Sequence, residues 1–273
     1  MEKLIFSDQF LYKSNERIIP GSVSQAALSE HFARYLFAKK YSQGKRVLNV
    51  ASGCGYGSEI LNSSAREIFN IDISEQLVAY GNLNYGNYKN HFLTMDAQKM
   101  AFPDKYFDLI VTFETFEHLP KYSNFLTECH RVLKDNGKII LSMPNKKITS
   151  PSFDKPVNMF HFKEWTIEEF ERIIDGKYQI DRFYGQNFTT PNHYSKLFSI
   201  TIFQKLLNFL YQNIPATIFK FIKKHYLKFK VYRTNEVRLD KKDKIIEAKI
   251  ENFDTHLNNL AYAIIIVILS KKN

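Results

Sequence analysis

Three glycines near the start of the chain are the residues best suited to holding a small ligand. Gly53, Gly55 and Gly57 lie in RVLNVASGCGYGSEIL, residues 46–61, between a strand-like run and a helix-like run. Glycine allows positive φ and close approach of a ligand, and a turn of this kind is typical of sites for nucleotide-like ligands. Ser58 stands where the dinucleotide fingerprint needs its third glycine, and no P-loop Gly-Lys-Ser/Thr follows. The turn therefore predicts an adenosine-containing ligand without a pyrophosphate.

An acidic residue follows the next strand-like run. Asp72 ends that run and lies about twenty residues beyond the glycines, where a doubly wound fold places a carboxylate against ribose hydroxyls. Alternatively, Asp72 caps a helix that starts at Ser74. Two further strand-like runs end in residues that could contact a ligand. Residues 91–95 are followed by Asp96 and Ala97, and residues 106–113 are followed by ETFEHLP.

Two of the eight histidines lie where an acceptor molecule is expected. His118 follows the run 106–113, at the carboxyl end of a strand, where open sheets bind ligands. His161 follows a loop rich in Pro, Ser and Asn, residues 144–156. Histidine is the usual general base near neutral pH, so both are candidate catalytic residues and His161 is also a candidate substrate contact. The alternatives are a structural or cofactor-proximal role for His118 and loop packing for His161.

In these motifs the chain resembles the class I S-adenosylmethionine (SAM)-dependent methyltransferases, in particular their small-molecule group. The resemblance is strongest over residues 45–181 and is carried by VLNVASGCGYG, IDIS, MDAQKMAFPDKYFDLIVTFETFEHL, HRVLKDNGKIILSMPN and NMFHFKEWTIEEF. It implies an α/β fold: a doubly wound, Rossmann-like, seven-stranded sheet whose last strand is antiparallel.

The resemblance also implies a SAM pocket. Gly53 and Gly55 would approach the methionine end, and Asp72 would hold the ribose. Ile73 would lie behind the adenine. The full set of implied cofactor residues is Asn49, Ala51, Gly53, Gly55, Asp72, Ile73, Asp96, Ala97 and Glu114.

Two of these residues depart from the family pattern, since Asn49 replaces the usual acid and Ala51 the usual glycine. Asparagine still donates and accepts hydrogen bonds, so we expect weakened rather than abolished SAM binding.

The domain organisation follows from an apolar, β-branched run near the end of the chain. Residues 261–269 fit a buried strand better than a helix, and the resemblance pairs this strand with 178–184. We therefore predict one methyltransferase domain over 1–273, made of an N-terminal arm and helix (1–44), a SAM-binding core (45–184), a helical insertion or lid (185–259) and the final strand (260–270).

Two segments outside the core have open interpretations. Residues 195–230 are aromatic, apolar and lysine-rich at helical spacing, which fits either peripheral contact with an anionic membrane or a lid packed on the sheet. Tyr12 and Arg17 lie in the N-terminal arm. They could cover the SAM pocket, bind an anionic acceptor or simply join the arm to the domain surface.

Composition excludes several other classes of function. The formal charge is +10, but no clustered basic stripe or known module indicates nucleic-acid binding. Cys54 and Cys129 fit neither a disulfide framework nor a zinc site. The sequence has no Asp-rich divalent-metal pattern of the catechol O-methyltransferase kind, so we expect metal-independent transfer. The N-terminal segment has no signal-peptide pattern, so we expect a cytoplasmic protein, with a peripheral position at the inner membrane as the alternative. The oligomeric state is not predicted.

The predicted reaction is methyl transfer from SAM to an oxygen of a small or glycan-linked acceptor. An Arg-containing segment before the Gly-Tyr-Gly-Ser turn looks like that of methyltransferases from polysaccharide biosynthesis clusters. This resemblance implies a sugar hydroxyl or a phosphate-type oxygen (for example of a phosphoramidate) in a bacterial capsule or surface polysaccharide precursor. The alternatives are a lipid or quinone precursor as acceptor, and a SAM-binding pseudoenzyme.

Overall fold

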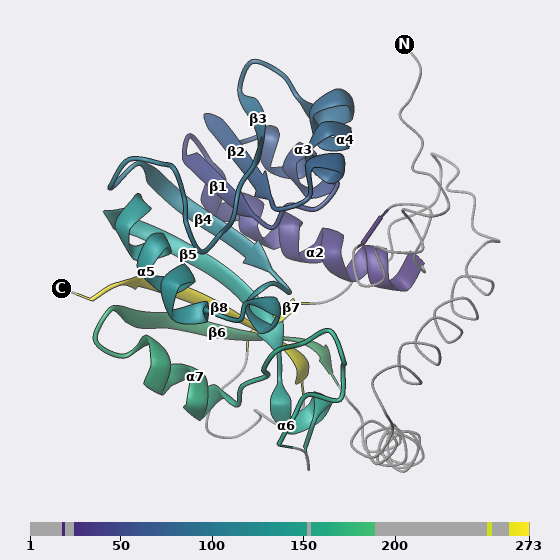
Figure 1. Ribbon diagram of the computed structural model, residues 1–273, viewed down its shortest axis with the longest axis vertical. Coiled ribbons are helices and arrows are strands. Elements are labelled where there is room, and N and C mark those ends of the chain that lie inside the picture. The colour runs from purple at the N-terminus through teal and green to yellow at the C-terminus, as the bar shows by residue number, and fades with distance from the viewer. Residues whose placement is uncertain (1–17, 20–24, 152–153, 189–249, 253–261, 273) are drawn as a thin grey trace. The chain divides into compact units, whose positions relative to one another are not determined.

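The computed structural model describes residues 18–19, 25–151, 154–188, 250–252 and 262–272. Its central feature is one mixed β-sheet, which runs across Figure 1. From one edge to the other, the strands are β3 (Asn90–Thr94), β2 (Glu67–Asp72), β1 (Arg46–Val50), β4 (Phe107–Phe113), β5 (Leu133–Pro144), β8 (Tyr262–Lys271), β6 (Tyr178–Phe188) and β7 (Ile250–Asn252).

The strand directions confirm the predicted doubly wound fold. Strands β3, β2, β1, β4 and β5 are parallel, and β8 is antiparallel to both of its neighbours, β5 and β6. These strands with β6 make up the seven that were predicted. The short strand β7, which pairs with β6 at the edge of the sheet, is an addition that the sequence did not indicate.

The order of the strands brings the candidate site residues to one edge of the sheet. In register, Val50 of β1 pairs with Ile71 of β2 and with Thr112 of β4. The chain order reverses between β1 and β4, and the carboxyl ends of the parallel strands lie together at this switch point. Ligands bind there in open α/β sheets.

Helices cover both faces of the sheet. They are α2 (Gln25–Ser42), α3 (Tyr56–Asn62), α4 (Glu75–Tyr85), η1 (Phe116–His118), α5 (Tyr122–Val132), α6 (Lys146–Thr149) and α7 (Ile167–Ile174). Local sequence sets several of their starts. The side-chain cap of α4 is Ser74 rather than Asp72, the alternative that the sequence offered, and Thr166 with Glu169 forms a reciprocal capping box on α7.

The two faces of β1 have different surroundings, because successive strand residues point to opposite sides. Leu48 and Val50 join the main hydrophobic cluster, to which β4, β5, β8, α5 and α7 contribute. Asn49 points to the other face, where Tyr35 of α2 donates a hydrogen bond to it.

Aromatic packing fixes η1 at the end of β4. Phe116 is fully buried, and its ring centroid lies 4.4 Å from that of Trp165. Since Phe116 is held in the core, the residues that follow it in η1 have little freedom to move.

The chain divides into two compact units. Residues 29–188 and 246–273 belong to the first, which contains the sheet. Most of the second (5–28 and 189–245), and with it most of the predicted insertion, lies outside the described residues, as do Tyr12 and Arg17. None of the described helices combines the length and apolar composition that crossing a membrane requires.

Candidate active site

The glycine turn after β1 has the geometry that its sequence predicts. Gly53 and Gly55 have φ of 57° and 87°, which favours glycine. A Cβ on Gly55 would lie 2.4 Å from the Phe92 ring, so the turn also needs glycine there for packing. A Cβ on Gly53 would meet nothing within 4 Å, which leaves open space beside the backbone for a ligand.

Asp72 connects the glycine turn to the turn between β2 and α4. One oxygen of its carboxylate accepts a hydrogen bond from the Gly53 backbone N–H at 3.0 Å, and the other accepts from the Ser74 N–H at 2.9 Å. The side-chain cap of α4 is Ser74 itself, which accepts from the Leu77 N–H. Each carboxylate oxygen can accept a further bond, so Asp72 has the capacity to bind hydroxyl groups while it holds both turns.

Residues on the neighbouring loops fit the remainder of an adenosine. Ile73 follows Asp72 and is 67% exposed, which is high for a large apolar side chain. A bond from the Met95 N–H to the Asp72 carbonyl, 3.0 Å long, keeps the end of β3 beside β2. The exposed Asp96 follows, and its Oδ1 accepts from the Gln98 N–H. Together they offer an apolar face and a polar edge, which suits a purine base.

Asn49 begins a series of buried hydrogen bonds that runs behind the glycine turn. Its Oδ1 accepts from the Tyr35 hydroxyl at 3.2 Å, and its Nδ2 donates to Asn70 Oδ1 at 2.9 Å. Asn70 in turn donates to Asn90, and Asn90 to Ser58, which donates to the Gly55 carbonyl. These contacts tie three strands to the turn; direct contact between Asn49 and a cofactor stays a prediction.

Two residues at the carboxyl ends of β1 and β4 have positive φ without being glycine. Ala51, which stands in place of the family's usual glycine, has φ of 52°, and Glu114 has φ of 49°. This conformation is uncommon for residues with a Cβ, and such outliers gather at functional sites.

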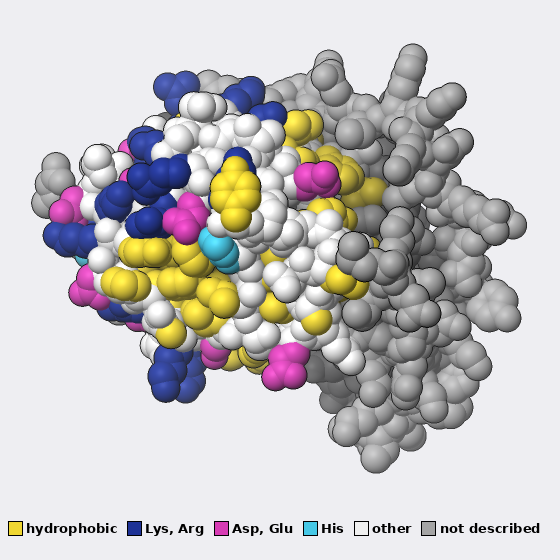
Figure 2. Space-filling view, turned by 90° about the horizontal axis from the view of Figure 1, so that it is seen from above, with side chains coloured by type: hydrophobic (Ala, Val, Ile, Leu, Met, Phe, Trp, Pro, Cys, Tyr) yellow, Lys and Arg dark blue, Asp and Glu magenta, His cyan; other side chains and the backbone are white. Residues whose placement is uncertain are grey.

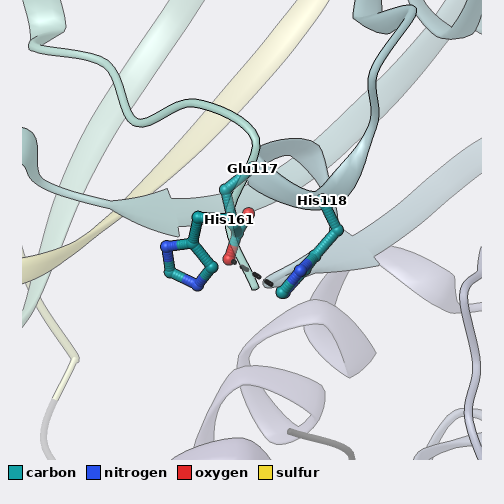
Figure 3. Close-up of side chains that lie close together, drawn as sticks. All are labelled: Glu117, His118 and His161. Carbon is teal, nitrogen blue, oxygen red and sulfur yellow. Dashed lines mark ion pairs between the residues drawn. The ribbon is translucent and has the colours of Figure 1, made fainter. Parts of the chain in front are cut away.

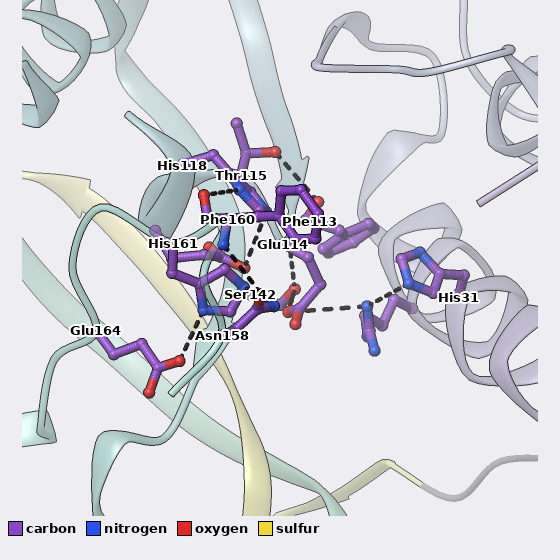
Figure 4. Close-up of polar contacts among 12 residues, drawn as sticks. His31, Phe113, Glu114, Thr115, His118, Ser142, Asn158, Phe160, His161 and Glu164 are labelled. Carbon is purple, nitrogen blue, oxygen red and sulfur yellow. Dashed lines mark hydrogen bonds and ion pairs between the residues drawn. The ribbon is translucent and has the colours of Figure 1, made fainter. Parts of the chain in front are cut away.

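The Glu114 side chain is held from two other elements. Ser142 of β5 donates to its Oε1 at 2.6 Å, and Arg34 of α2 lies 3.8 Å from the same oxygen. Arg34 is only 2% exposed and also donates to Gln186 of β6 at 2.6 Å. In the view of Figure 4, the Glu114–Ser142 pair lies between His161 and His31 of α2.

His118 and His161 lie side by side although they are far apart in the sequence. His118 also contacts Phe160, 42 positions later in the chain and next to His161. The ring centroids of the two histidines are 4.8 Å apart. The pairing is fixed by the backbone, because the Phe162 N–H donates to the Glu117 carbonyl at 2.8 Å. Both sequence-predicted histidines therefore belong to one cluster at the end of β4 (Figure 4).

The carboxylates around the histidines have contrasting environments. Burial, reinforced by the nearby charges of Glu114 and Glu164, raises the pKa of Glu117 well above its ordinary value. Burial alone would also raise the pKa of Glu164, but hydrogen bonds from His161, Thr149 and Ser150 lower it overall. Glu164 Oε1 lies 2.7 Å from His161 Nδ1, and the two form a His–carboxylate pair.

Four contributors to this region were missed by the sequence analysis: Arg34, Glu117, Ser142 and Glu164. Glu117 and Glu164 had local signals, being one and three residues from the two candidate histidines. Arg34 and Ser142 had none, because only the folded sheet brings α2 and β5 beside β4.

Comparison with known proteins agrees with this geometry. Residues 48–141 match the family model described as a methyltransferase domain. A "Probable S-adenosylmethionine-dependent methyltransferase" of Mycolicibacterium smegmatis is 29% identical over 163 residues, which cover 59% of this chain and 63% of that protein. Thus the match spans less than two thirds of that relative.

Two further relatives, matched over shorter stretches, have names that state a reaction. A fatty-acid O-methyltransferase of Mycolicibacterium smegmatis is 29% identical over 115 residues, 41% of this chain and 42% of that protein. A ubiquinone biosynthesis O-methyltransferase of Coxiella burnetii is 30% identical over 122 residues, 41% of this chain and 49% of that protein.

Among solved structures, the [4+2]-cyclase SpnF superposes with a TM-score of 0.57 at 16% identity, over 93% of this chain and 85% of that one. This likeness shows the fold alone, and the fold is compatible with more than one reaction. The glycine turn, the strand order and the match of residues 48–141 to the methyltransferase-domain model together support placing this part of the chain among the class I SAM-dependent methyltransferases.

Proposed function

We propose that this protein transfers the methyl group of SAM to an oxygen atom of an acceptor molecule. The observation that carries the proposal is the hydrogen bond from the Gly53 N–H of the glycine turn to the Asp72 carboxylate. Open space at Gly53 and the exposed Ile73 lie beside it. Bound SAM would supply an electrophilic methyl group on a sulfonium. In this arrangement Asp72 would bind the ribose hydroxyls, Ile73 would cover the adenine face and Asp96 with Ala97 would meet its edge.

The main task of the remaining residues is alignment. Holding an acceptor atom in line with the methyl group contributes roughly 7–11 kcal/mol to lowering a barrier of this type. The residues available to position it are those at the ends of β4 and β5 and in the 154–164 loop, which carry Glu114, His118 and His161.

The pair of imidazoles favours oxygen as the acceptor atom. A hydroxyl must lose its proton during transfer, and a histidine near neutral pH assists this loss. His161 is oriented by Glu164 at 2.7 Å, and His118 by the Phe160 carbonyl at 3.1 Å. Oriented rings of this kind suit the activation of a hydroxyl, which at His161 would have to replace the Asn158 amide that lies 2.9 Å from Nε2.

Two classes of acceptor remain as proposals. The first is a sugar hydroxyl or phosphate-type oxygen of a surface-polysaccharide precursor, which rests on the resemblance of the N-terminal segment. The second is a lipid or quinone precursor. It is supported by the exposed apolar side chains of Met159 and Phe162, which flank His161, and by the names of the two O-methyltransferase relatives.

Calorimetric titration with SAM and with its demethylated product tests the cofactor part of the proposal. Asp72→Asn should weaken SAM binding by about 10- to 100-fold, the scale of one charged hydrogen bond. The matched control is Asp175→Asn, an exposed residue that pairs with Lys272 after β8, and it should bind as the wild type does. A wild-type protein that binds neither compound would contradict the proposal.

The acceptor is tested with radiolabelled SAM and a panel that contains nucleotide-linked sugars, long-chain fatty acids and hydroxylated quinone precursors. Label in the sugars supports the first class, and label in the fatty acids or quinone precursors supports the second. A protein that binds SAM but labels no member would support the pseudoenzyme alternative.

A further inference from the structure

Glu117, His118 and His161 form a compact set of ligand-type atoms at the acceptor end of the candidate site. One ring nitrogen of each histidine and one carboxylate oxygen of Glu117 all lie within 4.8 Å of one another. Figure 3 shows the Glu117 carboxylate between the two rings, which come from η1 and from the loop that precedes α7. Glu117 Oε1 lies 3.9 Å from His118 Nε2, which is too long for a hydrogen bond.

Within the described part of the chain, the Glu117 carboxylate lacks the hydrogen-bond partners that a buried carboxylate ordinarily has. Its side chain is 1% exposed, and neither oxygen has a hydrogen-bond partner among the described residues. Leaving buried polar atoms unsatisfied costs folding free energy. Such a group, directed at two imidazoles, indicates a missing positively charged partner.

The hydrogen bonds of the two histidine Nδ1 atoms are independent evidence for a cation site. His118 Nδ1 lies 3.1 Å from the Phe160 carbonyl, and His161 Nδ1 lies 2.7 Å from the Glu164 carboxylate. Since both partners are acceptors, each Nδ1 carries the proton and each Nε2 presents a lone pair. Metal-binding histidines characteristically donate their second ring N–H to a carbonyl or a carboxylate in this way.

We propose that Glu117, His118 and His161 bind one divalent transition-metal cation of the Mn²⁺, Fe²⁺ or Zn²⁺ class. Two imidazoles and one carboxylate are a typical ligand set for these cations, whereas Mg²⁺ and Ca²⁺ prefer oxygen ligands alone. In the present arrangement the Asn158 amide nitrogen lies 2.9 Å from His161 Nε2 and donates to it. The cation would replace Asn158 at this nitrogen. The inference departs from the metal-independent transfer expected from the sequence.

The role of the cation rests on the proposed function, although its binding does not. With a cation bound, His118 and His161 would be ligands rather than proton acceptors, and the cation would activate the acceptor hydroxyl in their place by lowering its pKa. The hydroxyl proton would pass to water, and the oxygen would form the new bond to the methyl carbon. The carbon–sulfur bond would break with its electron pair remaining on sulfur, so no oxidant or reductant is needed.

Calorimetric titration of chelator-treated protein with MnCl₂ and with ZnCl₂, in the absence of SAM, tests the site directly. The wild type should bind one equivalent of cation, and Glu117→Gln and His118→Gln should each lose it. The control is His130→Gln on α5, whose ring packs against Tyr178 rather than in the cluster, and it should bind as the wild type does. Circular dichroism of every variant shows whether it has folded, and His118, which is 32% exposed, is the position where substitution should be tolerated.

The result that overturns the inference is a wild type that binds neither cation saturably, or a full equivalent bound by both cluster variants. Titration of the same preparation with SAM separates this outcome from failure of the proposed function. SAM binding without cation binding removes the metal site alone. Cation binding without SAM binding supports the metal site and contradicts the proposed function.

Discussion

The asparagine at position 49 has a structural role that the family's usual acid could not perform in this chain. Asn49 uses its carbonyl oxygen toward Tyr35 and its N–H toward Asn70. Asn70 in turn accepts from Asn49 through its carbonyl oxygen and donates through its N–H to Asn90. All three side chains are fully or almost fully buried. An aspartate has no N–H to donate, so the replacement is part of a matched set of amides.

Asn49→Asp, which restores the family's usual residue, should therefore destabilise the protein. The substitution places a carboxylate against the Asn70 carbonyl oxygen in a buried position, and the expected loss is about 1–3 kcal/mol of the free energy of unfolding. Urea unfolding at neutral pH measures it. Asn84→Asp is the matched control, because Asn84 is exposed on α4 and donates to the Tyr80 carbonyl of the same helix. Equal stability of Asn49→Asp and the wild type would contradict the role given to the amides.

At the scale of elements, α5 holds the loop that carries Asp96 and Ala97. Glu128 of α5 accepts a hydrogen bond from the Met100 N–H at 2.6 Å and two from the Arg131 guanidinium, at 2.9 Å and 2.8 Å. Arg131 reaches on to the Phe102 carbonyl at 2.6 Å. The hydrogen bonds from Arg131 hold the pKa of Glu128 below its ordinary value.

This pair gives stability a defined pH dependence. Because the pKa of Glu128 is lower in the folded than in the unfolded state, its contribution is present above the unfolded pKa of about 4.3 and is lost as pH falls through the folded pKa. Glu128→Gln should cost roughly 1 kcal/mol at pH 7 and should flatten the loss of stability below about pH 4.5. Urea unfolding between pH 7 and pH 3 measures both effects. The exposed Glu171 of α7 provides the control, as Glu171→Gln, and identical pH profiles for Glu128→Gln and the wild type would refute the assignment.

The elements also show what the sequence could and could not predict. The glycine turn, Asp72 and the apolar strands have local patterns, and their places in the sheet follow from the resemblance. The joining of His118 to His161 depends on hydrogen bonds between distant segments, such as those from Phe162 to the Glu117 carbonyl and from His118 to the Phe160 carbonyl. The burial of Arg34 depends on α2 meeting β6. Contacts between distant segments leave no periodic signal in one sequence, and β7 is too short to leave any.

For the whole molecule, β8 is the strand that completes the sheet. It pairs along its length with β5 on one side and β6 on the other, and Ile265 to Leu269 are buried. Hydrophobic and charged side chains are unevenly distributed over the surface. Figure 2 shows hydrophobic side chains gathered on one face, with Lys and Arg beside them. Removing the pairing of β8 would expose two long strand edges at once.

A charge in the middle of β8 should consequently unfold much of the protein. Val267 is fully buried and in register with Leu141 of β5 and Phe183 of β6. Val267→Asp should lower the free energy of unfolding by about 3–5 kcal/mol, the cost of an uncompensated buried charge. Thermal unfolding followed by circular dichroism measures the change, with the exposed Lys272→Gln as control. A melting curve like that of the wild type would show that β8 is not integral to the sheet.

The position of β8 also bears on the order in which the protein can fold during synthesis. β5 and β6 leave the ribosome before the strand that separates them in the sheet, and residues 189–261 must be made in between. Until β8 arrives, each of the two waiting strands has an unpaired edge that can associate with another chain. The nascent polypeptide is thus most exposed to association with other chains during that interval, and its yield in a cell should depend on how quickly translation reaches residue 262.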